Sequence, residues 1–424
     1  MQRTSAVRFL APLGVVLAAA ALVTFSPPAT AQSATAVPPY RNPALSVDER
    51  VADLVSRMTL EEKVGQLLML DARGEDLSFV NTRQPGALLH ILGAKIGRAM
   101  DLAEKNRLGI PLLIGEDGIH GHSFWKGANI FPTQLAMAAS WSPELLERMG
   151  RVTAEEMAPT GIHETFSPVL CLTRDVRWGR TGETFGEDPY LIGELGVALI
   201  RGYQGKGLDD PTAVVATAKH YAGYSETQGG RDASEADISR RKLRSYFLPP
   251  FERAARAGAM MFMTGYQSMD GVPSTASKWL LREVLKDEWG FPGVLVTDWD
   301  NVGRLVHEQK VAATYADAAT MAIRAGNDLI MTTPKFYEGA IEAVKSGQLK
   351  ESEIDEPLKR LLALKFRMGL FENPRRPDLA KAAAEVARPD HRAAVLDAAR
   401  QSLVLLQNDG LLPLDPGKVK SIAV

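Results

Sequence analysis

Residues 290–302 read GFPGVLVTDWDNV, and this stretch decides the fold that we expect for the chain. Its centre, from Gly293 to Thr297, is a short apolar run without polar alternation, which is typical of a strand covered on both faces. Asp298 follows at the point where such a strand should end. We therefore expect a buried strand that presents a carboxylate at its carboxyl end.

The same pattern recurs along the chain, with helical segments between the strands. Seven strands are predicted, at residues 87–92, 111–115, 166–172, 214–219, 259–265, 293–297 and 328–332. Helices are predicted at residues 145–157, 241–257, 279–288, 313–325, 355–368 and 391–401. Repeated βα units over roughly 300 residues predict an α/β fold of the (β/α)8 TIM-barrel type. An open doubly wound sheet is the alternative, but no glycine-rich nucleotide fingerprint follows the early strands.

Side chains that can carry chemistry stand at the ends of these strands. Asp117, Lys219, His220, Tyr266 and Asp298 each lie at or just after a strand end, and in a barrel those ends face one mouth. A carboxylate fixed there suits a nucleophile that must be rigid and ionised. A lysine there could hydrogen-bond a substrate, pair with a carboxylate or form a Schiff base, which leaves an aldolase as an alternative function.

Arg180 and Trp299 are further candidate binding residues, whereas three histidines are weighed as metal ligands and not retained. Arg180 offers a fork of donors for hydroxyls or carboxylates, and Trp299 can pack on a sugar face beside Asp298. The three histidines considered as metal ligands are His120, His122 and His163. No HExxH pattern or suitably spaced acidic cluster supports them, so we expect neither a metal nor a cofactor.

The composition bounds the class of protein and its partners. The chain has 424 residues, of which 45% are hydrophobic and 24% charged, as in ordinary globular proteins. A net charge of −2 gives no electrostatic case for binding nucleic acid or an anionic membrane surface. The single cysteine, Cys171, is expected to be a buried thiol and excludes an internal disulfide.

The N-terminus has the pattern of a secretory signal peptide. Arg3 and Arg8 precede an apolar run at residues 9–25, and small residues follow at 29–31, a cleavage position. An uncleaved membrane anchor is the rival interpretation, although the run is short for a spanning helix. We expect an exported bacterial protein, periplasmic or secreted, with the signal at 1–31 and a linker at 32–43.

Six ordered segments together resemble glycoside hydrolase family 3. They are GIPLLIGEDGIHG (109–121), FPTQLAMAASW (131–141), FSPVLCLTRDVRWGRTGETFGEDPYL (166–191), AKHYAGYSETQGGRD (218–232), MTGYQSMDGVPST (263–275) and GFPGVLVTDWDNV (290–302). The resemblance runs from about residue 44 to the end. It implies a retaining mechanism in which an aspartate attacks the sugar while a carboxylic acid protonates the leaving oxygen.

The resemblance also implies roles for individual residues. Asp298 matches the nucleophile, and Tyr266 matches a tyrosine beside it. Asp117, Arg180, Lys219 and His220 match residues that hydrogen-bond the hydroxyls of the sugar. Glu183 matches a nearby supporting position.

The resemblance divides the chain into parts. It implies a barrel at 44–372, a linker and helix at 373–400, and the beginning of a second α/β domain, a sandwich, at 401–424. In two-domain members the acid/base is a glutamate of that second domain, so we expect it beyond residue 424. One branch of the family, the β-N-acetylglucosaminidases, carries a His-Asp dyad in the loop after the strand with Lys219 and His220. This branch is disfavoured, because residues 221–227 contain no histidine. Glu226 in this loop is an alternative local acid.

The resemblance implies a retaining, exo-acting β-glycosidase that removes terminal β-D-glucosyl residues. A β-xylosidase of the same family is the near alternative. A barrel that binds a sugar but turns over poorly, for want of its acid/base, is the alternative of another class.

Overall fold

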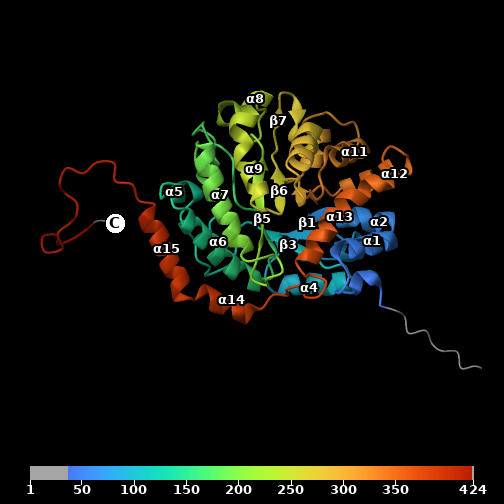
Figure 1. Cartoon of the computed structure of the whole chain (residues 1–424), viewed down its shortest axis with the longest axis horizontal. Helices are drawn as coiled ribbons and strands as arrows, with labels where there is room; N and C mark the ends of the chain where they lie inside the picture. Colours follow the sequence, from blue (N-terminus) through green and yellow to red (C-terminus); the bar gives the residue numbers. More distant parts are fainter. Residues whose placement is uncertain (1–36, 423–424) are drawn as a thin grey trace, which may run out of the picture. The chain divides into compact units, whose positions relative to one another are not determined.

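Eight parallel strands form the centre of the computed structural model, which describes residues 37–422 (Figure 1). In spatial order they are β10 (Ile330–Met331), β1 (Leu68–Asp71), β2 (Ala87–Leu89), β3 (Leu113–Glu116), β4 (Glu164–Thr165), β5 (Val215–Tyr221), β6 (Met261–Thr264) and β9 (Val294–Val296). A parallel bridge between Val296 and Leu329 joins the β9 edge to the β10 edge. The sheet therefore closes, which confirms the predicted (β/α)8 barrel.

Helices surround this barrel and connect its strands. The longer ones are α1 (Val47–Arg57), α4 (Ala94–Glu104), α6 (Pro143–Met157), α7 (Pro189–Gln204), η7 (Trp279–Glu288), α11 (Tyr315–Ala325), α12 (Phe336–Lys345) and α13 (Glu351–Arg367). The shorter ones are α2 (Leu60–Gln66), α3 (Phe79–Thr82), α5 (Gln134–Ala138), α8 (Arg240–Lys242), η5 (Leu243–Phe247), α9 (Pro249–Arg256) and α10 (Asn301–His307). A small antiparallel pair, β7 (Ser268–Met269) and β8 (Val272–Pro273), follows β6.

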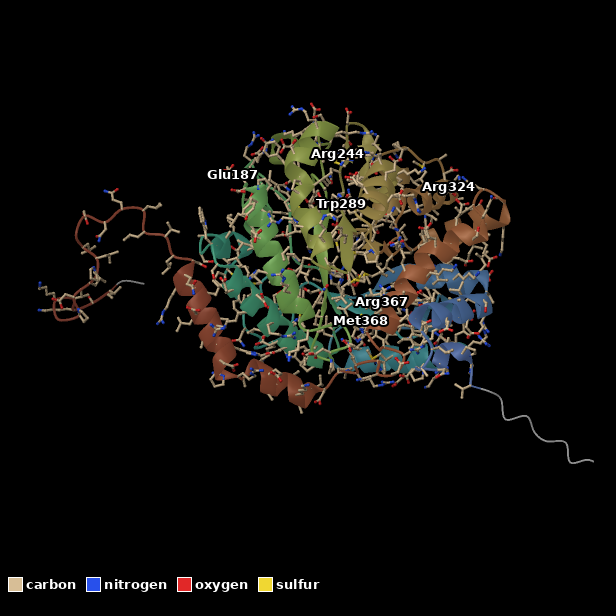
Figure 2. All side chains as sticks on the ribbon, in the orientation of Figure 1. Glu187, Arg244, Trp289, Arg324, Arg367 and Met368 are labelled. Carbon is tan, nitrogen blue, oxygen red and sulfur yellow. The ribbon has the colours of Figure 1, made fainter. Side chains whose placement is uncertain are left out.

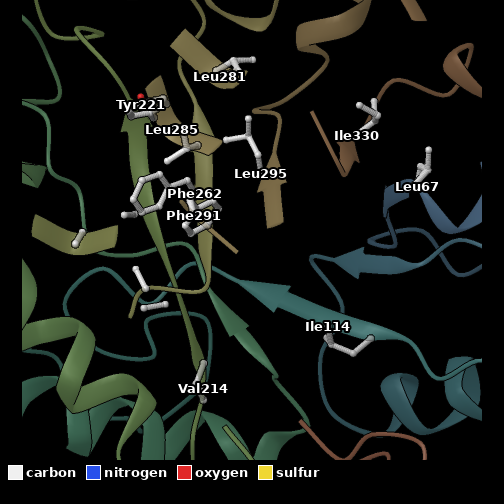
Figure 3. Close-up of a cluster of buried hydrophobic side chains, with 14 of the residues drawn as sticks. Leu67, Ile114, Val214, Tyr221, Phe262, Leu281, Leu285, Phe291, Leu295 and Ile330 are labelled. Atoms are coloured by element: carbon white, nitrogen blue, oxygen red, sulfur yellow. The ribbon is translucent and has the colours of Figure 1, made fainter. Parts of the chain in front are cut away.

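Both faces of each barrel strand are buried, which explains why the strands read as continuous apolar runs. Met69, Leu113 and Val294 belong to a cluster inside the barrel, and Leu361 and Leu364 of α13 belong to the same cluster. The outward-facing side chains form a second cluster with the helices, and Figure 3 shows part of it: Ile114, Val214, Phe262, Leu295 and Ile330 among others. Because alternate residues serve the two clusters, no polar alternation remains in the sequence.

The strand predictions need two corrections. Seven strands were expected and eight form the barrel, because β1 was missed: its apolar residues directly follow helix α2 without a turn signal, and a short apolar run does not distinguish helix from strand. The strand predicted at 166–172 is also wrong in position. The sheet strand is β4, Glu164–Thr165, and the segment after it joins β5 by a single bridge at Val169.

Charged side chains occupy the outer surface of the barrel. Figure 2 shows Arg244 and Arg324 there, away from the barrel axis. Each pairs with a glutamate, Arg244 with Glu288 and Arg324 with Glu353, at N–O distances of 2.8 Å. Pairs exposed to this extent contribute about 0–1 kcal/mol each, so the barrel depends on its apolar clusters for stability.

Two more helices, α14 (Leu379–Val386) and α15 (Pro389–Gln401), follow the barrel and pack against α6. Residues 403–406 and 411–414 are exposed apolar runs without helix or strand. A turn lies between them, in which Asn408 Oδ1 accepts hydrogen bonds from the backbone N–H groups of Gly410 and Leu412. Within residues 37–422 no helix has the length and hydropathy needed to cross a membrane.

Lys365 of α13 is a fully buried lysine. Its Nζ donates a hydrogen bond to Oε1 of Gln66 at 2.9 Å. Burial lowers the pKa of Lys365 to about 7, and no charged group of residues 37–422 offsets that effect. The folded protein therefore binds this proton more weakly than the unfolded chain does.

Replacing Lys365 with methionine should stabilise the protein at mildly acidic pH. The unfolded lysine titrates near 10.5, so between pH 7 and 10.5 the unfolded state binds more protons and stability rises with pH. We expect Lys365→Met to raise the free energy of urea unfolding at pH 6 by about 2–4 kcal/mol, with little gain at pH 10. Lys418→Met, at an exposed lysine, is the control. An equal difference between wild type and Lys365→Met at both pH values contradicts this account.

Candidate active site

Asp298 lies directly after β9, where the barrel opens, and its two carboxylate oxygens have different surroundings. Oδ1 accepts hydrogen bonds from the Tyr266 hydroxyl at 2.6 Å and from the Trp299 backbone N–H at 2.7 Å. Oδ2 lies 3.4 Å from Nε2 of His220. The carboxylate is thus held firmly through one oxygen, which leaves the other oriented for reaction.

The protonation of Asp298 is balanced between burial and its polar neighbours. Burial raises its pKa above the usual value, and the hydrogen bonds from Tyr266 and Trp299 oppose that rise. The positive charges of Lys219 and Arg180 oppose it as well. Without these four groups, the buried carboxyl would hold its proton to higher pH and lose its nucleophilic form.

Lys219 and His220 come from β5 and face Asp298 and Asp117. Nζ of Lys219 donates to Oδ1 of Asp117 at 2.8 Å, so the lysine pairs with a carboxylate from the end of β3. Of the roles that the sequence allows for Lys219, this contact is the pairing with a carboxylate. A Schiff-base aldolase needs an unprotonated amine, and an ion pair with Asp117 disfavours that form. Burial and the charges of Arg180 and Lys219 hold the pKa of His220 well below its usual range, so the imidazole is neutral.

Arg180 reaches the same place from the loop before η3 (Thr181–Glu183). Glu183 binds its guanidinium through two hydrogen bonds, Nε–Oε1 at 2.9 Å and Nη2–Oε2 at 2.8 Å. Burial alone would lower the pKa of Arg180, but this pairing raises it above its usual value. Nη1 also donates to the Tyr224 hydroxyl, which in turn donates to Asp232 at 2.6 Å. Glu183, Tyr224 and Asp232 therefore fix the orientation of Arg180.

Seven of the eight residues predicted for the site surround one cavity of about 230 Å³ at the mouth of the barrel. They are Asp117, Arg180, Lys219, His220, Tyr266, Asp298 and Trp299. This volume is below the ~300–1,000 Å³ of sites for drug-sized ligands, and it suits a small ligand. The eighth residue, Glu183, lines an adjoining cavity of about 460 Å³, which shares Asp117, Arg180 and Lys219 with the first.

Several residues of the site were not predicted from the sequence. His90 lines the cavity beside Trp299, with ring centroids 5.6 Å apart, and its Nδ1 lies 3.3 Å from Oδ1 of Asp71. Cys171 is buried as predicted, and its sulfur accepts a hydrogen bond from the backbone of His220. Burial raises the pKa of this thiol to about 12, so it stays neutral. His90 directly follows β2 and Asp71 is the last residue of β1. The sequence patterns pointed to neither, because the strand predicted at 87–92 includes His90 and β1 was not predicted.

The three histidines considered for metal binding are engaged elsewhere. The rings of His120, His122 and His163 contact Phe131 O, Thr160 Oγ1 and Pro374 O, respectively. In the described part of the chain, two other sets bring three ligand-type atoms within 4.8 Å of one another: His90, Glu116 and Asp117; and Glu155, Glu385 and His391. Protein cations already pair with carboxylates of both sets, Lys219 with Asp117 and Arg388 with Glu155, and we assign neither set to a metal.

The cavity thus combines a carboxylate held through one oxygen with several hydrogen-bonding side chains around it. A neutral imidazole, an ammonium, a guanidinium and a second carboxylate offer both donors and acceptors. An aromatic side chain, Trp299, stands at the edge. Such a set can hold a small polyhydroxylated ring over a nucleophile.

Comparison with known proteins agrees with this chemistry. Residues 59–364 match the family model described as "Glycosyl hydrolase family 3 N terminal domain". A β-xylosidase of Formosa agariphila is 35% identical over 395 residues, 89% of this chain and 50% of that protein. A periplasmic β-glucosidase of Salmonella typhimurium is 33% identical over 374 residues, 85% of this chain and 48% of that protein. The chain spans about half the length of these relatives.

Solved structures give the same picture. A β-glucosidase involved in saponin metabolism, from intestinal bacteria, is 56% identical with a TM-score of 0.84, over 88% of this chain and 49% of that one. A Listeria innocua β-glucosidase in complex with glucose is 35% identical with a TM-score of 0.81, over 87% of this chain and 53% of that one.

Proposed function

Since this chain belongs to glycosyl hydrolase family 3, we propose that it is the barrel of a retaining, exo-acting β-glycosidase with Asp298 as its nucleophile. The substrate class is a terminal β-D-glucosyl residue of an oligosaccharide or glucoside. The names of similar proteins, β-glucosidase and β-xylosidase, support this class.

The surroundings of Asp298 carry the proposal. Tyr266 and Trp299 bind Oδ1, so Oδ2 is the oxygen that attacks the anomeric carbon as the bond to the leaving oxygen breaks. The product is a glycosyl ester of Asp298. Water then attacks the same carbon, loses a proton to a base and releases the carboxylate, so the configuration is retained.

Asp117, Arg180, Lys219 and His220 hold the sugar in this scheme, and Glu183 supports Arg180. The side chains of Lys219 and His220 are nearly fully buried, so hydrogen bonds from them to sugar hydroxyls form away from water. Such bonds orient the ring before reaction, which is an effective way to lower the barrier.

The acid/base is proposed to lie outside this set. Among the residues that line the cavity, Asp117 is the one carboxyl besides Asp298, and Lys219 binds it. Glu226 is a poor proton donor: burial favours its neutral form, but hydrogen bonds from Arg174 and Lys242 lower its pKa. Without that acid/base, the barrel corresponds to the alternative function expected from the sequence, a barrel that binds a sugar but turns it over slowly.

We further propose that the chain is exported and that residues 401–424 belong to a second α/β domain. The exposed leucines at positions 403, 405 and 406 favour that domain, because apolar surface of this kind is normally covered. The predicted signal peptide lies outside residues 37–422.

A mechanism-based inhibitor tests the proposed nucleophile. A 2-deoxy-2-fluoro-β-glucoside with a dinitrophenolate leaving group should form a stable ester, because fluorine destabilises the oxocarbenium-like transition state of hydrolysis. We expect one glycosyl adduct per chain and its location on the peptide that contains Asp298, by mass spectrometry. An adduct on another carboxylate, with Asp298→Ala fully active, would contradict the assignment. The matching xyloside separates the two sugar classes by the rate of labelling.

A further inference from the structure

The strand order separates the walls of the cavity into two arcs. Asp298 follows β9 and Asp117 follows β3, so they stand on opposite sides of the barrel. One path between them runs through β6, β5 and β4, and the other runs through β10, β1 and β2. We define the first path as the polar arc and the second as the apolar arc.

The two arcs differ in how many hydrogen-bonding side chains they contribute. Tyr266, His220, Lys219 and Arg180 line the cavity from the polar arc, beside the apolar side chains of Phe166 and Met263. Met331 and Leu89 line it from the apolar arc. Among the cavity-lining residues of the apolar arc, His90 is the one with a hydrogen-bonding side chain.

The two edges of a glucose ring differ in the same way. With the anomeric carbon at Asp298, one edge carries the hydroxyls of C2 and C3, and the other carries the ring oxygen and C5. The hydroxyl of C2 is next to the anomeric carbon, and Oδ2 of Asp298 lies beside His220 on the polar arc. Pairing the hydroxyls of C2 and C3 with the arc that has more hydrogen-bonding side chains leaves the ring oxygen, C5 and the hydroxymethyl group for the apolar arc.

The backbone conformation and the ring contacts of His90 fix its position in the cavity wall. Its backbone has a φ of 54°, in the left-handed region that few non-glycine residues adopt. Asp71 binds Nδ1, and Arg73 binds Asp71 at 2.9 Å. One ring nitrogen of His90 lies within 4.8 Å of carboxylate oxygens of both Glu116 and Asp117.

We propose that His90 recognises the hydroxymethyl group on C5 and makes the site selective for hexosides such as glucosides over pentosides such as xylosides. This inference rests on the proposed function. Asp71 contacts Nδ1, so Nε2 of His90 is the ring nitrogen left to form a hydrogen bond with the C6 hydroxyl, which can both donate and accept. A xyloside has no such hydroxyl and leaves His90 without this partner.

Three 4-nitrophenyl glycosides test the proposal: the β-glucoside, the 6-deoxy-β-glucoside and the β-xyloside. We expect His90→Asn to lower kcat/KM for the glucoside by about 10–100-fold, the range for a hydrogen bond lost in a buried site. The other two substrates should change less than about threefold, because they lack the hydroxyl. Asparagine tolerates the left-handed backbone, so this variant preserves the fold better than His90→Ala.

A matched substitution serves as the control. His307→Asn changes a half-exposed histidine that pairs with Asp300 on α10, and it should leave all three substrates unaffected. An equal fall for all three substrates in His90→Asn overturns the proposal, since His90 then acts on packing alone. Unchanged glucoside turnover overturns it as well.

A binding measurement separates failure of this inference from failure of the proposed function. Isofagomine carries the hydroxymethyl group, and 3,4-dihydroxypiperidine is the same ring without it. Calorimetry should show that wild type prefers isofagomine and that His90→Asn loses most of that preference. If no glycoside is turned over, the proposed function fails and the calorimetric preference alone decides for or against His90. An equal preference in both proteins contradicts the role of His90.

Discussion

Replacing Asp298 with alanine should lower kcat/KM for aryl β-glucosides by about 10⁴-fold or more, as expected when a group that forms the covalent intermediate is removed. Tyr266 and Trp299 hold the carboxylate from one side, and no other cavity carboxylate of the described chain is free to replace it. Initial rates with a 2,4-dinitrophenyl glucoside measure the loss.

Azide provides the diagnostic control for this variant. The anion can enter the space left by the carboxylate, attack the anomeric carbon from the same face and expel the phenolate. The product should be α-glucosyl azide, with inverted configuration, because a single displacement replaces two. Asp300→Asn is the matched substitution: Asp300 is a carboxylate two residues further on that pairs with His307, and its loss should leave most activity intact. A fully active Asp298→Ala, or an azide product of retained configuration, excludes this role.

The second large effect is a dependence on the leaving group. If this chain lacks its own acid/base in the cavity, departure of a poor leaving group has no proton donor. The quantity to compare is the ratio of kcat/KM for 2,4-dinitrophenyl β-glucoside to kcat/KM for methyl β-glucoside. We expect this ratio to be about 10²–10⁴-fold larger in this chain than in a two-domain relative, which is the range of general-acid catalysis.

Glu226 supplies the control for the leaving-group experiment. Glu226→Gln should leave both substrates unaffected, because Arg174 and Lys242 hold this carboxylate in its ionised form. A selective loss on methyl glucoside in Glu226→Gln would identify Glu226 as the acid. Equal leaving-group ratios in this chain and in the relative would show that the chain carries an acid of its own.

The sequence predicts the barrel and most of the cavity because both depend on local patterns. Continuous apolar runs mark strands such as β5 and β9, and the polar residue after each run lies at the mouth. The pattern fails where a strand has no boundary of its own. Leu68–Asp71 continues the apolar stretch that begins in α2, and a one-dimensional pattern cannot separate the two elements.

The unpredicted parts of the site depend on contacts between distant segments. His90 matches no motif, and its place beside Trp299 follows from the neighbouring positions of β1, β2 and β10 in the closed sheet. Asp232 fixes Arg180 through Tyr224, across 52 residues of sequence. The burial of Lys365 likewise follows from how α13 packs on the barrel, which the spacing of its leucines does not reveal.

The division of the cavity into two arcs has a consequence for the evolution of this scaffold. Tyr266, which donates to Asp298, and the cations Lys219 and Arg180 belong to one side of the barrel, and His90, next to Trp299, belongs to the other. Mutations after β2 therefore change the wall beside Trp299, while Tyr266, His220 and Lys219 remain on other strands. A lineage could exchange one sugar for another by drift at a single strand end, and the ancestral chemistry would be inherited unchanged.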